Sequence, residues 1–272
     1  MSRARYHLAR GEWSTGLAIL RQYTIQYPSC PAGWHHYARW CFRTGAWQSA
    51  AEAIIQAHIL DPNDAAISQA ACSILASVRR LEDARPLVAE MLQQFPDRWS
   101  VWTTAGRVLV EAFRNKEYAC TVSARGPVLQ PDLAQAWFRH GRVLALAGKH
   151  REAVEVFEQG WQRLPDEGGD GFAAPAALWL GESYDVLGAA QQSRTWWETA
   201  VQRARYLSGL TPAMGHYWQG KAFAALGQKT NARRAYWMAL RHHVLHPSHR
   251  EVKEALKPSH PNACLPALVS DL

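Results

Sequence analysis

The stretch WFRHGRVLALAGKHREAVEVFEQGWQRLP, residues 137–165, has the spacing of two short helices joined by a turn. In its first half, Trp137 and Gly141 lie at helical spacing, and Gly148 supplies the left-handed turn that ends the helix. The second half carries apolar and small residues at the same spacing and stops at Pro165, which cannot continue a helix. One such pair cannot bury its own apolar face, so the stretch predicts neighbours of the same kind.

Residues of several types recur every 34 or 35 positions along the chain. The recurring residues are Pro28, Pro62, Pro96, Pro131 and Pro165; Trp34, Trp102 and Trp137; Gly11 and Gly45; Trp13 and Trp47; and Ala50, Ala84, Ala119 and Ala153. Two looser units follow, around Gly181 and Gly220. A period shared by several residue types over five units predicts a repeat architecture.

The pattern Trp-x2-His-Gly-x2-Leu, Ala-x3-Phe and a closing Pro resembles the tetratricopeptide repeat (TPR), with His140 where that family prefers Leu and Leu144 where it prefers Tyr. The resemblance implies an all-α, right-handed superhelix of about seven helix-turn-helix units with a short C-terminal capping helix. Trp137 and Phe157 are expected in the core of the fifth unit. The units are expected at residues 1–28, 29–62, 63–96, 97–131, 132–165, 172–210 and 211–247, with the capping helix and an irregular tail at 248–272.

Several places depart from the repeat pattern. Arg79 replaces the turn glycine of the third unit, and Gly126-Pro127 predicts that the second helix of the fourth unit bends or ends early. Surplus residues around 206–212 predict a longer second helix or loop in the sixth unit. The short first helix of the first unit, at about residues 2–10, predicts apolar surface that a partner or preceding residues would cover.

The charge and the cysteines bound the kind of partner and the compartment. The chain has 272 residues, with 30 Lys and Arg against 23 Asp and Glu, which favours an acidic partner. No stretch approaches a signal peptide or a membrane span, so we expect no membrane contact. Five cysteines at irregular spacings indicate reduced thiols, and together these features favour the cytoplasm.

Motifs for catalysis or cofactor binding are not found in the sequence. It lacks phosphate-binding and dinucleotide-binding glycine patterns, zinc-protease helices and paired-cysteine zinc spacing, so we expect no enzymatic activity, no cofactor and no metal site. His242, His243, His246 and His249 lie near one another, but Pro247 interrupts the helix and no acid joins them closely. We interpret them as favourable charges near a helix C-terminus.

The resemblance implies a binding groove, because the first helices of TPR units line a concave face. The position after the consensus glycine holds Arg5, Arg39, Ser73, Arg107, Arg142, Glu182 and Lys221, of which five are basic. Arg107 and Arg142 are expected to be adjacent like charges with no acid between them. A row of guanidinium groups with interleaved aromatic rings suits carboxylates on an extended peptide. The expected partner-binding residues are Arg5, His35, His36, Arg39, Arg107, Phe138, Arg139, Arg142, Trp179, Trp218 and Lys221.

Three functions remain open at this point. The first is a non-enzymatic scaffold that holds an acidic or extended segment of another protein in the groove. The second is a regulatory or recruiting subunit or domain of a larger enzyme complex. The third is RNA binding by helical repeats, which the positive charge favours and the many acidic residues disfavour. A chaperone-tail adaptor is disfavoured, because none of the five clamp positions, Met1, Arg5, His36, Ala66 and Ala70, carries the residue of that clamp.

Overall fold

The computed structural model describes residues 2–164, 171–245 and 248–257, and within these ranges it contains helices and no strand. The prediction of an all-helical array is confirmed. The helices are α1 (Ser2–Ala9), α2 (Trp13–Gln26), α3 (Pro31–Thr44), α4 (Trp47–Leu60), α5 (Ala65–Ser77), α6 (Leu81–Gln94), α7 (Trp99–Glu111), α8 (Lys116–Leu129), α9 (Ala134–Ala147), α10 (His150–Trp161), α11 (Ala173–Val186), α12 (Ala190–Leu210), α13 (Pro212–Ala225), α14 (Lys229–Arg241) and α15 (Ser248–Leu256).

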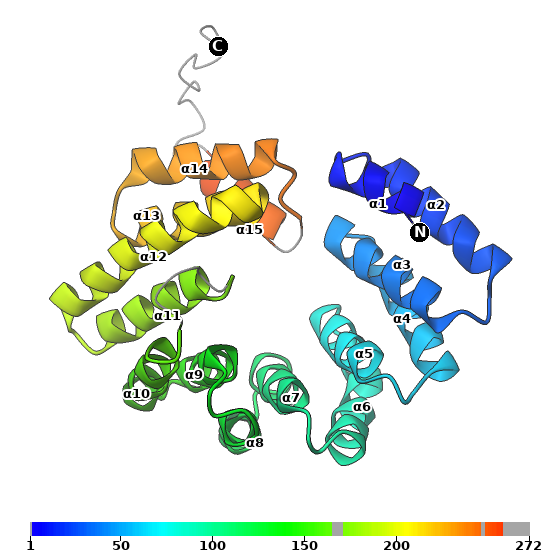
Figure 1. Cartoon of the computed structure of the whole chain (residues 1–272), viewed down its shortest axis with the longest axis horizontal. Helices are drawn as coiled ribbons and strands as arrows, with labels where there is room; N and C mark the ends of the chain where they lie inside the picture. The colour runs from blue at the N-terminus through cyan, green and yellow to red at the C-terminus, as the bar shows by residue number, and fades with distance from the viewer. Residues whose placement is uncertain (1, 165–170, 246–247, 258–272) are drawn as a thin grey trace, which may run out of the picture.

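The helices pack in consecutive pairs that follow one another around an arc (Figure 1). Each odd-numbered helix from α3 to α11 also contacts the next odd-numbered helix, so these helices form a continuous layer that ends at α13. Figure 1 shows α5, α7 and α9 on the inner side of the arc and α6, α8 and α10 on its outer side. We call the surface of α1, α3, α5, α7, α9, α11 and α13 the inner face.

A hydrogen bond from a tryptophan ring to a proline carbonyl explains part of the 34-residue period. The indole N–H groups of Trp34, Trp102 and Trp137 donate to the carbonyl oxygens of Pro28, Pro96 and Pro131, each at 2.8 Å. In the third unit, the hydroxyl of Ser68 donates to the carbonyl of Pro62 at 3.4 Å. Each bond ties the start of a first helix to the proline six residues earlier, so the chain enters the second, third, fourth and fifth units in the same way.

The turn within each unit requires a left-handed backbone. Gly11, Gly45, Gly148, Gly188 and Gly227 adopt it with φ between 73° and 90°. Arg79, Arg114 and His243 adopt it with φ of 65°, 58° and 59°. A Cβ atom in this conformation costs about 1–2 kcal/mol per residue, so these three turns store strain that the glycine turns avoid.

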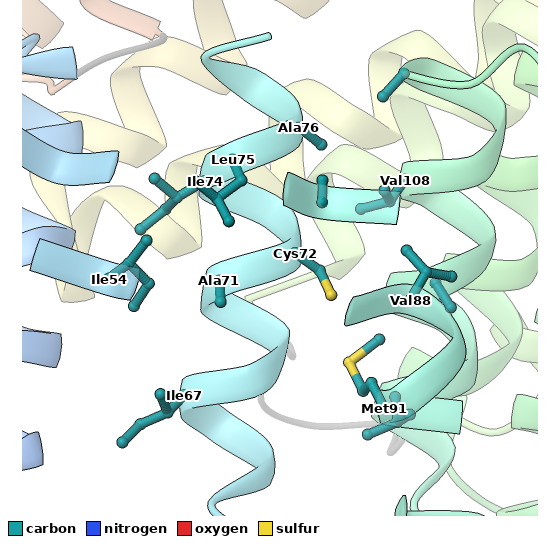
Figure 2. Close-up of a cluster of buried hydrophobic side chains, with 14 of the residues drawn as sticks. Ile54, Ile67, Ala71, Cys72, Ile74, Leu75, Ala76, Val88, Met91 and Val108 are labelled. Carbon is teal, nitrogen blue, oxygen red and sulfur yellow. The ribbon is translucent and has the colours of Figure 1, made fainter. Parts of the chain in front are cut away.

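The core of the second to fourth units is aliphatic. Figure 2 shows Leu75 of α5 together with Ile54, Val88, Met91 and Val108 from the neighbouring helices. All five are at most 5% exposed, so the units share one continuous core rather than separate ones.

The fifth unit is held by a ring against a glycine. Phe157 is completely buried, as predicted, and a Cβ atom on Gly141 would lie only 2.9 Å from its ring. Trp137 does not share this core, and its expected burial is wrong. It is half-buried because its indole N–H reaches back to Pro131, and Arg163 lies over its ring at 4.3 Å.

Two of the expected departures from the repeat have different outcomes. The helix α8 continues through Pro127 to Leu129, so it does not end early. Gly126 packs against the Thr103 side chain, and this tertiary contact holds the helix although the proline removes one backbone bond. The prediction for the sixth unit is confirmed, because α12 runs for 21 residues.

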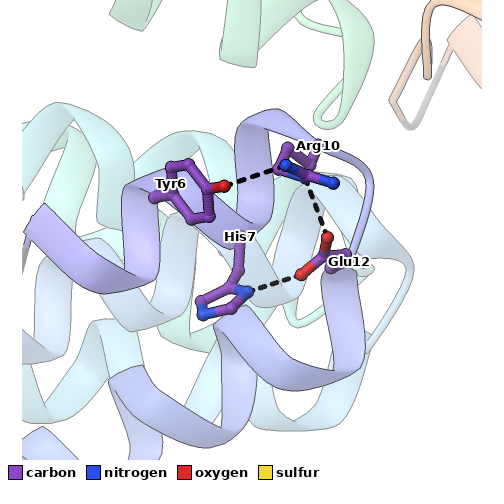
Figure 3. Close-up of polar contacts among 4 residues, drawn as sticks. All are labelled: Tyr6, His7, Arg10 and Glu12. Atoms are coloured by element: carbon purple, nitrogen blue, oxygen red, sulfur yellow. Dashed lines mark hydrogen bonds and ion pairs between the residues drawn. The ribbon is translucent and has the colours of Figure 1, made fainter.

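The first unit has a small core of its own and a polar corner. Ala4 and Leu8 of α1 are buried against Leu20. At the corner, the carboxylate of Glu12 lies 2.5 Å from His7 Nδ1 and 3.0 Å from Arg10 Nε (Figure 3). These contacts lower the pKa of the Glu12 carboxyl, His7 contributing most, and they join α1 to the start of α2.

The first and seventh units contact each other across the opening of the arc. A Cβ atom on Gly11 would lie 2.6 Å from the His243 ring, so only glycine fits this approach. The ring of Trp13 meets His243 and His249 edge to face, with centroids 6.3 Å and 6.1 Å apart. The surface that the short first unit was expected to expose is therefore partly covered by the other end of the array.

Candidate functional site: the inner face

The second unit presents a cluster of cationic and imidazole side chains on α3. Arg39 and Arg43 are exposed one helical turn apart, and the Arg43 guanidinium lies 4.9 Å from the Trp40 ring. One turn earlier, the rings of His35 and His36 stack with centroids 6.0 Å apart. We call Arg39, Arg43, His35 and His36 the α3 cluster.

Acidic groups are scarce around the α3 cluster. The helix itself contains no Asp or Glu. Asp64 faces His35, but its carboxylate caps α5 by accepting from the backbone N–H groups of Ala66 and Ile67. Burial, with smaller contributions from the charges of Arg39 and His36, lowers the pKa of His35 to about 4. The cluster therefore holds concentrated, poorly neutralised positive charge at neutral pH.

Positive charge dominates the inner helices as a group. The seven odd-numbered helices from α1 to α13 carry eight Lys or Arg residues and three acids, and two of those acids are on α11. The cations are Arg3, Arg5, Arg39, Arg43, Arg107, Arg139, Arg142 and Lys221, and the acids are Glu111, Glu182 and Asp185. The excess therefore lies between α1 and α9.

Two cations of the later units, Arg142 in the fifth and Lys221 in the seventh, are neutralised by carboxylates. Arg142 of α9 pairs with Glu182 of α11 at 3.3 Å and lies over the Trp179 ring at 4.9 Å. Lys221 lies 3.5 Å from Glu251 of α15. The same carboxylate accepts from the Tyr217 hydroxyl at 2.6 Å, and burial together with this bond raises the pKa of Tyr217. These cations are parts of ion pairs rather than open charges.

Arg107 is also paired, which corrects the expectation of two adjacent arginines without an acid. Its guanidinium donates to Glu111 at 2.8 Å and to the Ser73 hydroxyl at 2.9 Å. Glu111 lies one turn after Arg107 on α7, whereas Glu182 holds the repeat position of Arg107 and Arg142 in the sixth unit. The helical spacing of Arg107 and Glu111 was visible in the sequence, and the pairing of Arg142 with Glu182 across 40 positions was not.

The aromatic positions of the inner face divide into core and surface. Phe138 is completely buried against Gly160, so its expected place in a binding surface is wrong. Trp179 and Trp218 are half-buried and meet at a right angle, with centroids 6.0 Å apart. Arg139 lies over the rings of Trp99 and Phe172 at 5.3 Å and 5.0 Å. The side chain of Arg5 lies outside the part of the chain that the structure describes.

Arg43, Trp40 and Glu251 were missed by the sequence analysis. Arg43 follows Arg39 by four positions, so helical spacing alone places the two on one face. Glu251 comes from α15, and no repeat position points to it. The structure thus moves the open positive charge of the expected site toward the second unit.

The histidines near the end of α14 take part in ring contacts. His242 stacks on His216 with centroids 5.5 Å apart, and His243 and His249 pack against Trp13. His246 lies outside the described residues. Across the described ranges, no three His, Cys, Asp or Glu side chains gather in an arrangement that could hold a metal ion. The helices in those ranges are too short or too polar to cross a membrane.

Comparisons with known proteins agree with this geometry. Residues 1–65 match the family model described as tetratricopeptide repeat. A tetratricopeptide repeat protein from Parabacteroides merdae superposes with a TM-score of 0.60 at 14% identity, over 94% of this chain and 95% of that one. The chain has the tetratricopeptide-repeat fold.

Two further solved structures superpose on the chain at similarly low identity. The APC/C hetero-tetramer Cut9-Hcn1 gives a TM-score of 0.56 at 12% identity, over 93% of this chain and 48% of that one. PilW, a type IV pilus biogenesis factor, gives 0.53 at 15% identity, over 82% and 98%. No curated protein matches the chain. A TPR array is generally a scaffold for contacts with other proteins, and the fold leaves the partner to be argued from the site.

Proposed function

We propose that the protein is a non-enzymatic scaffold whose inner face binds an extended, acidic segment of another protein. The observation that carries this proposal is that Arg39 and Arg43 are exposed on a helix with no acid, in an array whose inner helices carry eight Lys or Arg residues and three acids in their sequence. Guanidinium groups form charge-assisted, often bidentate, hydrogen bonds to carboxylates, and each such bond contributes about 1.5–3 kcal/mol.

The shape of the array supports an extended partner. The odd-numbered helices lie side by side from α3 to α13, so successive units offer contacts along a line rather than in one deep pocket. An extended segment can follow such a line and place carboxylates against the α3 cluster while its other residues reach later units. The buried thiols of Cys41 and Cys72, whose pKa values burial raises to about 11 and about 12, suit the reducing cytoplasm.

The test is titration with a short fluorescent peptide of alternating Glu and Ala, followed by anisotropy. The Arg39→Ala, Arg43→Ala double variant should bind it about tenfold or more weakly, the equivalent of one lost charge-assisted bond. The matched control is Arg205→Ala with Arg234→Ala, which removes the same charge from exposed positions on the outer helices α12 and α14. Its affinity should fall less than threefold.

Two results would contradict the proposal. One is equal weakening in both double variants, which would mean that only net charge matters. The other is preference for homopolymer RNA over the acidic peptide with a steep salt dependence, which would favour RNA binding instead. A peptide of alternating Gln and Ala measures any binding that does not depend on carboxylates.

A further inference from the structure

A small cavity opens on the inner side of the array where the end of α5 meets the last turn of α7. Its volume is about 160 Å³. The lining includes Arg79, Arg107, Ser77 and Glu111, with Ala76 and Val108 as its apolar part. A water molecule needs only about 10–15 Å³ of such volume, so the cavity has room for a small acid group and several waters.

Arg79 reaches this cavity from a strained position. It ends α5 in the left-handed conformation with φ of 65°, where five other units have glycine. Strained backbone tends to persist where a side chain has a role, although strain alone does not identify one. In the part of the chain that the structure describes, no hydrogen bond or ion pair engages the Arg79 guanidinium. Its donors therefore remain available to a ligand.

Arg107 faces the cavity from the opposite helix with part of its donor set in use. One terminal nitrogen donates to Glu111 and the other to the hydroxyl of Ser73. A guanidinium carries five N–H donors, so these two bonds leave three for a ligand. Because Glu111 fixes the guanidinium in place, the free donors are already oriented.

We infer that this cavity binds a single carboxylate group, held between Arg79 and Arg107. The two arginines and Glu111 give the lining a formal charge of +1, which one carboxylate balances. A phosphate dianion would exceed that charge and would meet the Glu111 carboxylate. The inference rests on the proposed function in that the carboxylate is supplied by the bound acidic segment, from an Asp or Glu side chain or from a C-terminus.

Replacement of each strained arginine by glycine separates binding from strain. Arg79→Gly and Arg114→Gly remove the same charge and relieve the same backbone conformation, but Arg114 does not line the cavity. Both variants should therefore denature at a higher midpoint than the parent. Arg79→Gly should weaken binding of the Glu-Ala peptide about tenfold, and Arg114→Gly should leave it unchanged. Equal affinities in the two variants would overturn the inference.

A second measurement does not need the peptide. The Nε–H signals of arginine side chains are followed by NMR during titration with N-acetylalanine, which offers a terminal carboxylate, and with N-acetylaspartate N-methylamide, which offers a side-chain carboxylate. At least one of the two compounds should shift the Nε–H signals of Arg79 and Arg107 saturably and leave the Arg114 signal unchanged. The compound that binds more tightly indicates whether the carboxylate comes from a C-terminus or from a side chain. Absence of a saturable shift with both, or equal saturation by inorganic phosphate, would refute the carboxylate site.

The two measurements also separate failure of the site from failure of the function. Saturation by a small carboxylate with no binding of the acidic peptide would retain the cavity site and reject the proposed scaffold function. Peptide binding that depends on Arg39 and Arg43 but not on Arg79 would retain the scaffold function and reject the cavity site.

Discussion

The inner face of the second unit differs from that of the fifth and seventh units in how its cations are neutralised. In the second unit, Arg39 and Arg43 are exposed on a helix without an acid. At the far side of the arc, Arg142 and Lys221 occupy the equivalent repeat positions and are paired with carboxylates. The same residue type at the same repeat position therefore stabilises packing in one region and leaves charge available in the other.

The difference lies in what the neighbouring elements supply. Glu182 is contributed by the next inner helix and Glu251 by α15, whereas α5 has no charged residue at all. A repeat position predicts where a side chain lies, and its neighbours decide whether its charge is open to a partner. Four changes, taken from the largest expected effect to the smallest, test this distinction.

In the paired region, Phe157 of the fifth unit fills the space beside Gly141, the residue before Arg142. Phe157→Ala should lower the free energy of unfolding by about 3–5 kcal/mol, because the side chain is fully buried. Urea denaturation followed by circular dichroism measures this. A loss below about 1 kcal/mol would mean that the ring does not hold the two helices of the fifth unit together.

Two histidines, His35 in the second unit and His140 in the fifth, make the stability of the protein depend on pH. Burial lowers the pKa of His140 to about 4 from its ordinary value of 6.5, and His35 has a pKa of about 4 for the same main reason. As the pH falls from about 6.5 to 4, these two histidines become protonated in the unfolded chain but stay neutral in the folded one. Stability is therefore complete above that range and falls within it, by about 3 kcal/mol for the more deeply buried His140.

Removal of the neighbouring charge should distinguish the two histidines. Arg39→Ala should raise the pKa of His35, because Arg39 contributes to its depression, and should leave the pKa of His140 unchanged. NMR titration of the ring C–H signals measures both in one sample. An unchanged pKa of His35 would indicate that the charge of Arg39 is neutralised in the parent protein.

Breaking the paired region at Glu251 should be costly. Glu251→Gln should lower the free energy of unfolding by about 1–3 kcal/mol, since the buried Tyr217 hydroxyl and Lys221 both lose a charged partner. Glu254→Gln on the same helix is the control, because Glu254 pairs with Lys257 at the surface and should change stability by less than about 0.5 kcal/mol. Equal effects would remove α15 from the inner-face network.

The smallest effects compare one arginine from each region. Arg142→Ala should lower the free energy of unfolding by about 0.5–1 kcal/mol, through its partly exposed pair with Glu182 and its contact with Trp179. Arg39→Ala should be neutral or slightly stabilising, because like charges nearby are relieved. Thermal denaturation of both variants decides this, and a reversed order would contradict the assignment of paired and open charge.

The repeat period predicted the fold because it is a property of residue spacing alone. The prolines, glycines and Phe157 mark turns and close helix contacts that recur whatever the partner is. The burial of Trp137 and Phe138 was harder to predict, because adjacent positions on a helix face different surroundings. The sequence did not show that the Trp137 indole would be drawn outward to Pro131 and leave Phe138 in the core.

The candidate site was predicted only in outline, for a physical reason. A repeat alignment places Arg107 and Arg142 on the inner helices, but their neutralisation depends on acids outside that repeat position, Glu111 on the same helix and Glu182 on the next inner helix. Glu251 reaches Lys221 across 30 positions of sequence. Arg79 becomes a candidate binding residue only because the structure places it in the lining of the cavity beside Arg107. Positions were therefore predictable, and their electrostatic partners mostly were not.

The approach of Gly11 and Trp13 to His243 and His249 has a consequence for cooperativity. In a linear repeat array, each unit is stabilised by its nearest neighbours, so the outermost units have one interface instead of two and fray first. Here the first unit gains a second interface from His243 and from His249 of α15, at the other end of the array. Opening of either end should therefore release both, and their slowly exchanging amide protons should share one opening free energy.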